Sequence, residues 1–166
     1  MRVTLLSKAL VVGAYQRKCE LLAAQPGIEL TVLVPPRWDN QKLELAHTEG
    51  YALRVIPIRL NGNFHLHYYP TLTAALRESQ PEIFHIDEEP YNLATFLALR
   101  AARGLKSKRR VRTLFFSWQN IFKRYPAPFR WFEHSVLQDI DAAIAGNAES
   151  AAVWRAKGFA KPVYTV

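Results

Sequence analysis

The sequence has little cysteine, little glycine and no long apolar run. Cys19 is the only cysteine among 166 residues, so no disulfide can form within the chain. Its helical spacing from Tyr15 and Leu22 predicts a small buried apolar side chain instead. The seven glycines nowhere form the Gly-x-Gly-x-x-Gly pattern of dinucleotide-binding loops, which argues against a nicotinamide cofactor.

The longest apolar run is short, and several catalytic motifs are missing. Residues 9–14 include Gly13 and fall far below the roughly 20 residues that cross a bilayer. Val3 to Leu6 resembles a strand and is too short for the core of a signal peptide, so we expect a cytoplasmic protein. The sequence shows no Ser-His-Asp pattern, phosphate loop or zinc motif, which leaves the corresponding enzyme classes without their residues.

Positive charge is present in excess. Lysine and arginine number 22 against 14 aspartates and glutamates, which gives a net charge of +8. Such a surface attracts nucleic acid, anionic membranes or phosphorylated ligands. Part of the excess lies in one run, made of Arg103, Lys106, Lys108, Arg109, Arg110 and Arg112. This run is either a solvated linker between a helix and a strand or a binding surface for a polyanion.

Short apolar runs alternate with helical patterns along the whole chain. Strands are expected at residues 2–6, 29–34, 51–58, 83–86, 111–116, 142–145 and 162–166. Helices are expected at residues 13–25, 70–79, 91–103, 129–140 and 148–157. This alternation predicts an α/β fold, a Rossmann-like three-layer α/β/α domain with a mainly parallel sheet. The length suits one such domain over residues 1–166.

The chain is organised around residues 81–92, Pro-Glu-Ile-Phe-His-Ile-Asp-Glu-Glu-Pro-Tyr-Asn, where a buried strand ends at three consecutive acids. In parallel sheets such turns carry ligand chemistry. Pro90 suits the first position of the following helix, and Glu89 can cap it. Capping accounts for one or two of the carboxylates. Asp87, Glu88 and Glu89 are therefore either helix caps or part of a functional site.

Other polar residues follow the remaining strands at the same predicted edge. They are Ser7, Lys8 and Gly13, then Asn61, Asn63, His65 and His67, then Ser117, Trp118, Gln119 and Asn120, and finally Gly146 and Asn147. Amides, carboxylates, imidazoles and a tryptophan face are suited to sugar hydroxyls and sugar C–H faces. Asn147 is most simply the cap of the last helix. The two histidines lack a third ligand nearby, so no metal is expected.

Four stretches, taken together and in order, are similar to the N-terminal half of GT-B glycosyltransferases of the large retaining group often called family four. They are residues 61–70, 81–92, 115–131 and 141–150. The resemblance implies an acceptor-binding domain of a hexosyltransferase active in cell-surface polysaccharide biosynthesis. Its donor would be a nucleotide-diphosphate sugar, its acceptor a glycan or lipid-linked molecule, and transfer would proceed with retention and without a cofactor. A second Rossmann-like domain beyond Val166 would bind most of the donor, so we expect the 166 residues alone to be inactive.

The resemblance also implies a set of site residues. The candidates for acceptor binding are His65, His67, Asp87, Glu88, Glu89, Tyr91, Asn92, Trp118, Gln119 and Asn120. Gly13 is the candidate contact for a donor phosphate, although a glycine there also permits close packing. Many relatives have a histidine followed by an acid where this chain has Gln119 and Asn120, which leaves no proton-carrying ring at that position. The alternative function is a non-catalytic Rossmann-like module that binds polyanions or nucleic acid.

Residues 121–131 combine aromatic and basic side chains without an acid. The expected helix that follows places Phe129, Phe132, Val136 and Ile140 on one apolar face, with Trp131 pointing the opposite way. Lys123, Arg124, Arg130 and Trp131 are therefore candidates for contact with an anionic membrane or a lipid-linked acceptor. The alternative is that Trp131 packs under a neighbouring loop or under another domain.

Overall fold

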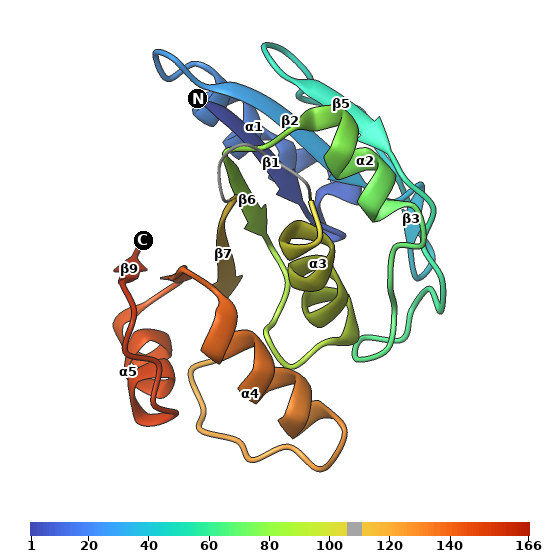
Figure 1. Ribbon diagram of the computed structural model, residues 1–166. Coiled ribbons are helices and arrows are strands. Elements are labelled where there is room, and N and C mark those ends of the chain that lie inside the picture. Colours follow the sequence, from blue (N-terminus) through green and yellow to red (C-terminus); the bar gives the residue numbers. More distant parts are fainter. Residues whose placement is uncertain (106–110) are drawn as a thin grey trace.

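The computed structural model describes residues 1–105 and 111–166, and these residues form a seven-stranded parallel sheet with helices on both faces (Figure 1). The strands are β1 (Arg2–Leu6), β2 (Glu29–Val34), β5 (Ala52–Val55), β6 (Ile83–Ile86), β7 (Arg112–Ser117), β8 (Ala142–Ala145) and β9 (Val163–Thr165). Their order in the sheet is β5-β2-β1-β6-β7-β8-β9. The predicted Rossmann-like α/β/α fold is confirmed.

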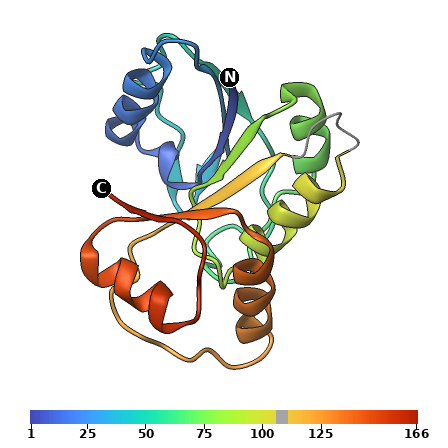
Figure 2. The same cartoon turned by 60° about the vertical axis from the view of Figure 1, so that its left-hand side comes forward.

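The helices divide unequally between the two faces of the sheet. They are α1 (Arg17–Ala23), α2 (Leu72–Ser79), α3 (Leu93–Arg103), α4 (Phe129–Asp139) and α5 (Ala148–Ala156), with short 3-10 helices η1 (Ala9–Val11) and η2 (Gly13–Gln16). Parallel crossovers are right-handed, so the direction of each one along the sheet decides the face of its helix. The crossover from β1 to β2 runs toward β5 and places α1 on one face. The crossovers that contain α2 to α5 run toward β9 and place these helices on the other face. Figure 2 shows α1 across the sheet from α2, α3 and α4.

Alternation along the strands builds two apolar cores. Leu6, Phe84 and Phe115 belong to the larger core, under α2 to α5, where Trp154 of α5 is fully buried. Leu5 points to the other face and packs with the smaller core around α1, which contains Cys19. The prediction that Cys19 is buried is confirmed.

Helix α1 covers only part of its face. On that side of β7 and β8, Leu114, Phe116 and Ile144 are half-buried, and Tyr164 of β9 is 61% exposed. The right-handed crossovers after β6 place their helices on the opposite face, so no helix of the described chain covers this region.

Three local details differ from the expected elements. The expected helix over residues 13–25 is divided into η2 and α1, and the weakly patterned segment after β2 contains an antiparallel hairpin of β3 (Arg37–Trp38) and β4 (Gln41–Lys42). Helix α3 begins at Leu93, so Pro90 does not occupy its first position. Instead, the chain turns at 90–92, where the Asn92 N–H donates to Glu89 O (3.1 Å) and the Leu93 N–H donates to His65 O (2.9 Å).

Candidate functional site

Strand register brings the polar residues that follow β1 and β6 together. Leu6 pairs with Ile86, so Ser7 and Lys8 lie beside the acids that follow β6. The hydroxyl of Ser7 donates to Asp87 Oδ2 (2.8 Å), and Lys18 of α1 donates to the same oxygen (2.7 Å). The Asp87 side chain is only 8% exposed. Asp87 therefore fastens the end of β6 to β1 and α1.

Glu88 points into the protein and forms a buried ion pair with Lys8. Its Oε1 also accepts a hydrogen bond from the Tyr69 hydroxyl (3.1 Å) and lies 3.4 Å from His67 Nε2, although the His67 contact lacks hydrogen-bond geometry. Burial raises the pKa of Glu88, but Lys8 and His67 outweigh burial and lower it to about 2. Glu88 is thus an ionised internal anchor that a bound sugar cannot reach without rearrangement.

His67 connects this ion pair to the loop before α2. Its Nδ1 lies 3.1 Å from the carbonyl oxygens of both Asn63 and Phe64, and its ring meets Trp38 edge-on at 4.7 Å between centroids. Both ring nitrogens therefore lie near oxygen atoms, Nδ1 near the two carbonyls and Nε2 near Glu88. The Lys8 ammonium lies over the rings of Trp38 (5.1 Å) and Phe64 (4.8 Å). Buried charge therefore holds residues 63–67 closed over the end of β1.

Glu89 faces the opposite direction, toward the end of β7. Its Oε2 accepts a hydrogen bond from the Ser117 hydroxyl (2.6 Å), and its Oε1 accepts one from the Trp118 N–H (3.1 Å). Burial raises the pKa of Glu89 to about 7, although both hydrogen bonds act to lower it. Glu89 caps no helix, which corrects the capping interpretation. It is a half-buried carboxyl that can gain or lose a proton near neutral pH.

Trp118 presents a large ring to solvent beside Glu89. The side chain is 62% exposed, and the ring lies against Gly146, which directly follows β8. A β-carbon at position 146 would fall 2.2 Å from Trp118 Cε3. The next residue, Asn147, accepts a hydrogen bond from the Ser150 N–H (2.8 Å) and caps α5, as predicted.

A second group of aromatic residues borders this edge. Tyr91 and Tyr125 stack at 4.1 Å between ring centroids, and the Tyr125 hydroxyl donates to Gln119 Oε1 (3.3 Å). The half-buried ring of His65 lies 5.7 Å from Tyr91 and 4.9 Å from Phe129. The side-chain amide of Gln119 also donates a hydrogen bond to Ile121 O, whereas Asn120 is exposed.

The amide of Asn92 is buried without a polar partner. Neither its oxygen nor its nitrogen has a hydrogen-bond partner among the residues that the structure describes, and the residue has no exposed surface. It stands directly before α3 but does not cap the helix with its side chain. Asn92 is therefore not accessible to a ligand in this structure.

Gly13 is covered by the loop that follows β4. Its N–H donates to Glu44 Oε2 (2.7 Å), and a β-carbon on it would lie 2.7 Å from that of Ala46. Gln16 fixes the same loop by donating to Glu44 O and accepting from the Ala46 N–H. The N–H predicted to meet a donor phosphate therefore binds a carboxylate of the chain itself.

The sequence-predicted residues thus separate into two groups. One group gathers at the accessible carboxyl ends of β6 and β7 and consists of Glu89, Trp118, Gln119 and Asn120. We call these four residues, together with Ser117 and Gly146, the rim. Asp87, Glu88, His67, Tyr91 and Asn92 lie behind it, more deeply buried. Two contributors escaped sequence reasoning, Tyr69 and Tyr125. Their signals were adjacent aromatic residues after His67 and an isolated tyrosine within the basic segment.

The histidines do not converge on a metal. Across residues 1–105 and 111–166, no group of three or more His, Cys, Asp or Glu side chains could hold an ion. His65 packs among aromatic rings, whereas His67 faces Glu88.

The aromatic and basic segment before α4 is exposed. Lys123, Arg124 and Arg130 lie at the surface, and the Trp131 side chain is 56% exposed. The Trp131 ring nevertheless contacts Phe96 of α3 at 4.8 Å between centroids. In the expected apolar face, Phe132, Val136 and Ile140 are buried, and Phe129 is half-buried.

A comparison with family models identifies the family of the chain. The model of the glycosyl transferase 4-like domain matches residues 13–166. The chain belongs to the glycosyl transferase 4-like family. Among curated proteins, no match to the sequence was found. Family membership identifies the chain as a glycosyltransferase domain with a Rossmann-like fold. No helix in the described part of this glycosyl transferase 4-like chain is long and apolar enough to span a membrane.

Proposed function

We propose that this domain binds the acceptor in a glycosyl transfer from a nucleotide-diphosphate sugar, and that the rim is the acceptor site. The observation that supports this most directly is the pairing of Glu89 with Trp118. The main-chain N–H of Trp118 holds the Glu89 carboxyl, and the same residue presents an exposed indole ring, at the carboxyl ends of adjacent strands in a glycosyltransferase domain.

The two side chains supply complementary contacts to a sugar. The exposed face of Trp118 can stack on the C–H face of a pyranose. The other side of the ring lies against Gly146, whose missing side chain leaves room for it. Glu89 can accept a hydrogen bond from an acceptor hydroxyl, while Ser117 and the Trp118 N–H hold its carboxylate in place. Gln119 supplies an amide at the same edge.

In the proposed reaction, the domain positions and polarises the acceptor rather than forming a covalent bond with the sugar. Transfer proceeds with retention, and the departing diphosphate helps to remove the proton of the acceptor hydroxyl. Glu89 orients that hydroxyl, which is an entropic contribution to the rate. The Gly13 N–H contacts the donor diphosphate after Glu44 releases it, and a second domain holds the rest of the donor. No cofactor is required.

Transfer can be tested directly in the full-length protein. A panel of nucleotide-diphosphate sugars is offered with phosphorylated and unphosphorylated glycans and with lipid-linked acceptors, and release of the nucleoside diphosphate is measured. We expect acceptor-dependent release with one donor, and a higher KM for the acceptor in Trp118→Ala. Exposed Tyr164→Ala is the matched control. No acceptor-dependent release with any donor would contradict the proposal.

The alternative of a polyanion-binding module loses support at both ends of the basic run. Arg103 donates to Asp139 O and lies 3.3 Å from Asp141 Oδ2, and Arg112 lies 3.8 Å from Asp141 Oδ1. These arginines tie α3 and β7 to the start of β8. The remaining members of the run, Lys106, Lys108, Arg109 and Arg110, lie outside the described residues.

We also propose a peripheral contact with the inner face of a membrane through the exposed side of Trp131. Its ring contacts Phe96 and Phe132, yet the side chain remains 56% exposed, so part of it is free to enter a headgroup layer. Binding of the full-length protein to anionic liposomes should fall in Trp131→Ala. Equal sedimentation of wild type and variant would remove this residue as an anchor.

A further inference from the structure

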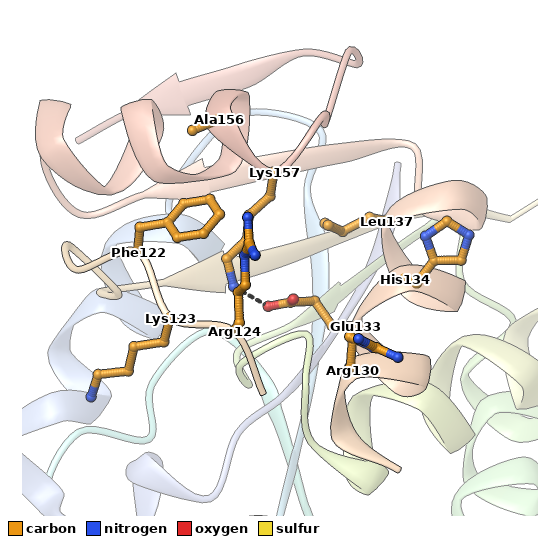
Figure 3. A pocket seen from close by; sticks show the side chains of 9 residues that line it. All are labelled: Phe122, Lys123, Arg124, Arg130, Glu133, His134, Leu137, Ala156 and Lys157. Carbon is orange, nitrogen blue, oxygen red and sulfur yellow. Dashed lines mark hydrogen bonds and ion pairs between the residues drawn. The ribbon is translucent and has the colours of Figure 1, made fainter. Parts of the chain in front are cut away.

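A basic groove lies between α4, the end of α5 and the segment 122–124 (Figure 3). It encloses about 360 Å³. Its cationic residues come from all three elements: Lys123 and Arg124 from the segment, Arg130 from α4 and Lys157 from the end of α5. Phe122 and Leu137 add apolar surface.

Among the described residues, one carboxylate lines this groove, and it is already paired with a cation. Glu133 of α4 forms an ion pair with Lys157, which Figure 3 shows reaching across from the end of α5. Both side chains are nearly buried, and Lys157 is held further over the rings of Tyr125 (5.1 Å) and Trp154 (5.2 Å). Burial raises the pKa of Glu133, although Lys157 acts to lower it. Glu133 therefore has no spare negative charge for the other cations.

The remaining cations have no acid of their own. Among the described residues, no carboxylate lies within ion-pair distance of Lys123, Arg124 or Arg130. Figure 3 shows Lys123 extending outward from the segment. His134 of α4 also lines the groove. A concave surface with this charge attracts an anion.

The chemistry of the lining favours a phosphate group. The planar guanidinium of arginine donates two parallel hydrogen bonds to phosphate oxygens, and ammonium groups add point charges. The enclosed volume lies at the lower end of the range for small-molecule pockets. It suits a phosphate or diphosphate together with a short adjoining part of its carrier.

Tyr125 connects this groove to the rim. One side of its ring meets the Lys157 ammonium, its ring stacks on Tyr91, and its hydroxyl donates to Gln119 at the rim. A ligand with a sugar at Trp118 and a phosphate in the groove would therefore pass along the segment 119–125.

We propose that the basic groove binds a phosphate or diphosphate group, and that this group belongs to the acceptor. The second statement rests on the proposed function, whereas the first does not. The acceptor is then a phosphorylated molecule, either a soluble sugar phosphate or a lipid-linked one.

Inorganic pyrophosphate is the probe for the first statement. Its binding to the full-length protein is measured by titration calorimetry at low ionic strength, for wild type, Arg124→Ala/Arg130→Ala and the control Arg77→Ala. Arg77 is an exposed arginine of α2, which lies far from α4 and α5 in Figures 1 and 2. We expect at least a tenfold loss of affinity in the double variant and no change in the control. Absent binding by wild type, or equal binding by the double variant, would overturn the site.

The source of the phosphate is separated by a second set of measurements. Co-sedimentation with vesicles that contain an anionic phospholipid is compared with binding of a soluble sugar phosphate. Arginine-dependent sedimentation that pyrophosphate displaces identifies a lipid-borne phosphate, and binding of the soluble compound alone identifies a soluble acceptor. In the transfer assay, loss of rate in Arg124→Ala/Arg130→Ala with phosphorylated acceptors only would assign the group to the acceptor. Equal loss with unphosphorylated acceptors would contradict that assignment. If the protein transfers sugar but does not bind pyrophosphate, the groove proposal fails and the proposed function is unaffected.

Discussion

The ring of Trp118 occupies the space that a side chain at Gly146 would fill. The distance of 2.2 Å from Trp118 Cε3 to a β-carbon at position 146 is far shorter than any contact between carbon atoms. Glycine therefore allows the exposed indole to lie flat against the turn after β8. The orientation of the proposed sugar platform depends on a missing methyl group, since little else covers the ring.

Gly146→Ala should displace the Trp118 ring and raise the KM for the acceptor. We expect tryptophan fluorescence to change, with a loss of about 1–3 kcal/mol in the free energy of unfolding from overpacking. Gly104→Ala is the matched control, because a β-carbon there meets nothing closer than 3.4 Å. If acceptor affinity is unchanged while the fluorescence shifts, the Trp118 ring is not a platform for the sugar.

Glu88→Gln and Glu89→Gln should differ in kind, although the residues are adjacent. Glu88→Gln removes the carboxylate that pairs with Lys8 and should lower the free energy of unfolding by about 3–5 kcal/mol, because a buried cation loses its partner. Glu89→Gln keeps most hydrogen bonds of a half-buried group, so its effect should fall on turnover, by about a hundredfold. Chemical unfolding and steady-state kinetics separate the two. A stable Glu88→Gln with impaired turnover would contradict the anchoring role.

The lowered pKa of Glu88 predicts a pH dependence of stability. Its pKa is about 2 in the folded protein against an ordinary 4.5, so the unfolded chain binds its proton more readily. The stabilising contribution of ionised Glu88 is present above about pH 4.5 and is lost as the pH falls toward 2. Urea unfolding at pH 5 and pH 3 should show a smaller difference for Glu88→Gln than for wild type. Equal differences would show that other groups govern acid unfolding.

Glu89 predicts the opposite sign. Its pKa is raised to about 7, so the folded protein holds the proton more tightly, and this contribution to stability is lost as the pH rises from 4.5 to 7. The ionised form that can orient a hydroxyl increases over the same interval. We expect kcat/KM to rise with pH through a midpoint near 7, and Glu89→Gln to lack this rise. A wild-type profile without an inflection near 7 would exclude Glu89 as the titrating group.

Much of the fold follows from local pattern. Apolar runs such as Ile83–Ile86, followed by helix-forming residues, predict strands and crossovers, and the handedness of crossovers then determines the faces. The hairpin of Arg37–Trp38 and Gln41–Lys42 was not predicted, because two-residue strands have no measurable periodicity. The start of α3 was misplaced because the Leu93 N–H is satisfied by His65, a contact between residues distant in sequence.

The sequence predicted which residues form the site but not which of their side chains are buried. Strand ends indicated which residues meet, and Glu89, Ser117 and Trp118 do meet. Sequence gave no means to tell that Glu88 turns inward and Glu89 outward, because Lys8 and His67 decide that direction from other segments. The same limit applied to Glu44, which lies in a loop without regular structure and contacts Gly13 from 31 residues away in the sequence.

That contact supplies the last prediction. Glu44 Oε2 accepts a hydrogen bond from the Gly13 N–H, the group proposed to meet the donor diphosphate, and so competes with it as an anion. Glu44→Ala should therefore increase the affinity of the full-length enzyme for its nucleotide-diphosphate sugar severalfold, measured by calorimetry. Glu49→Ala is the control, since it removes the same charge from an exposed residue of the same loop. Gln16 continues to hold Ala46 in the variant, so the loop keeps its fold. Unchanged affinity in Glu44→Ala would show that Gly13 serves close packing alone.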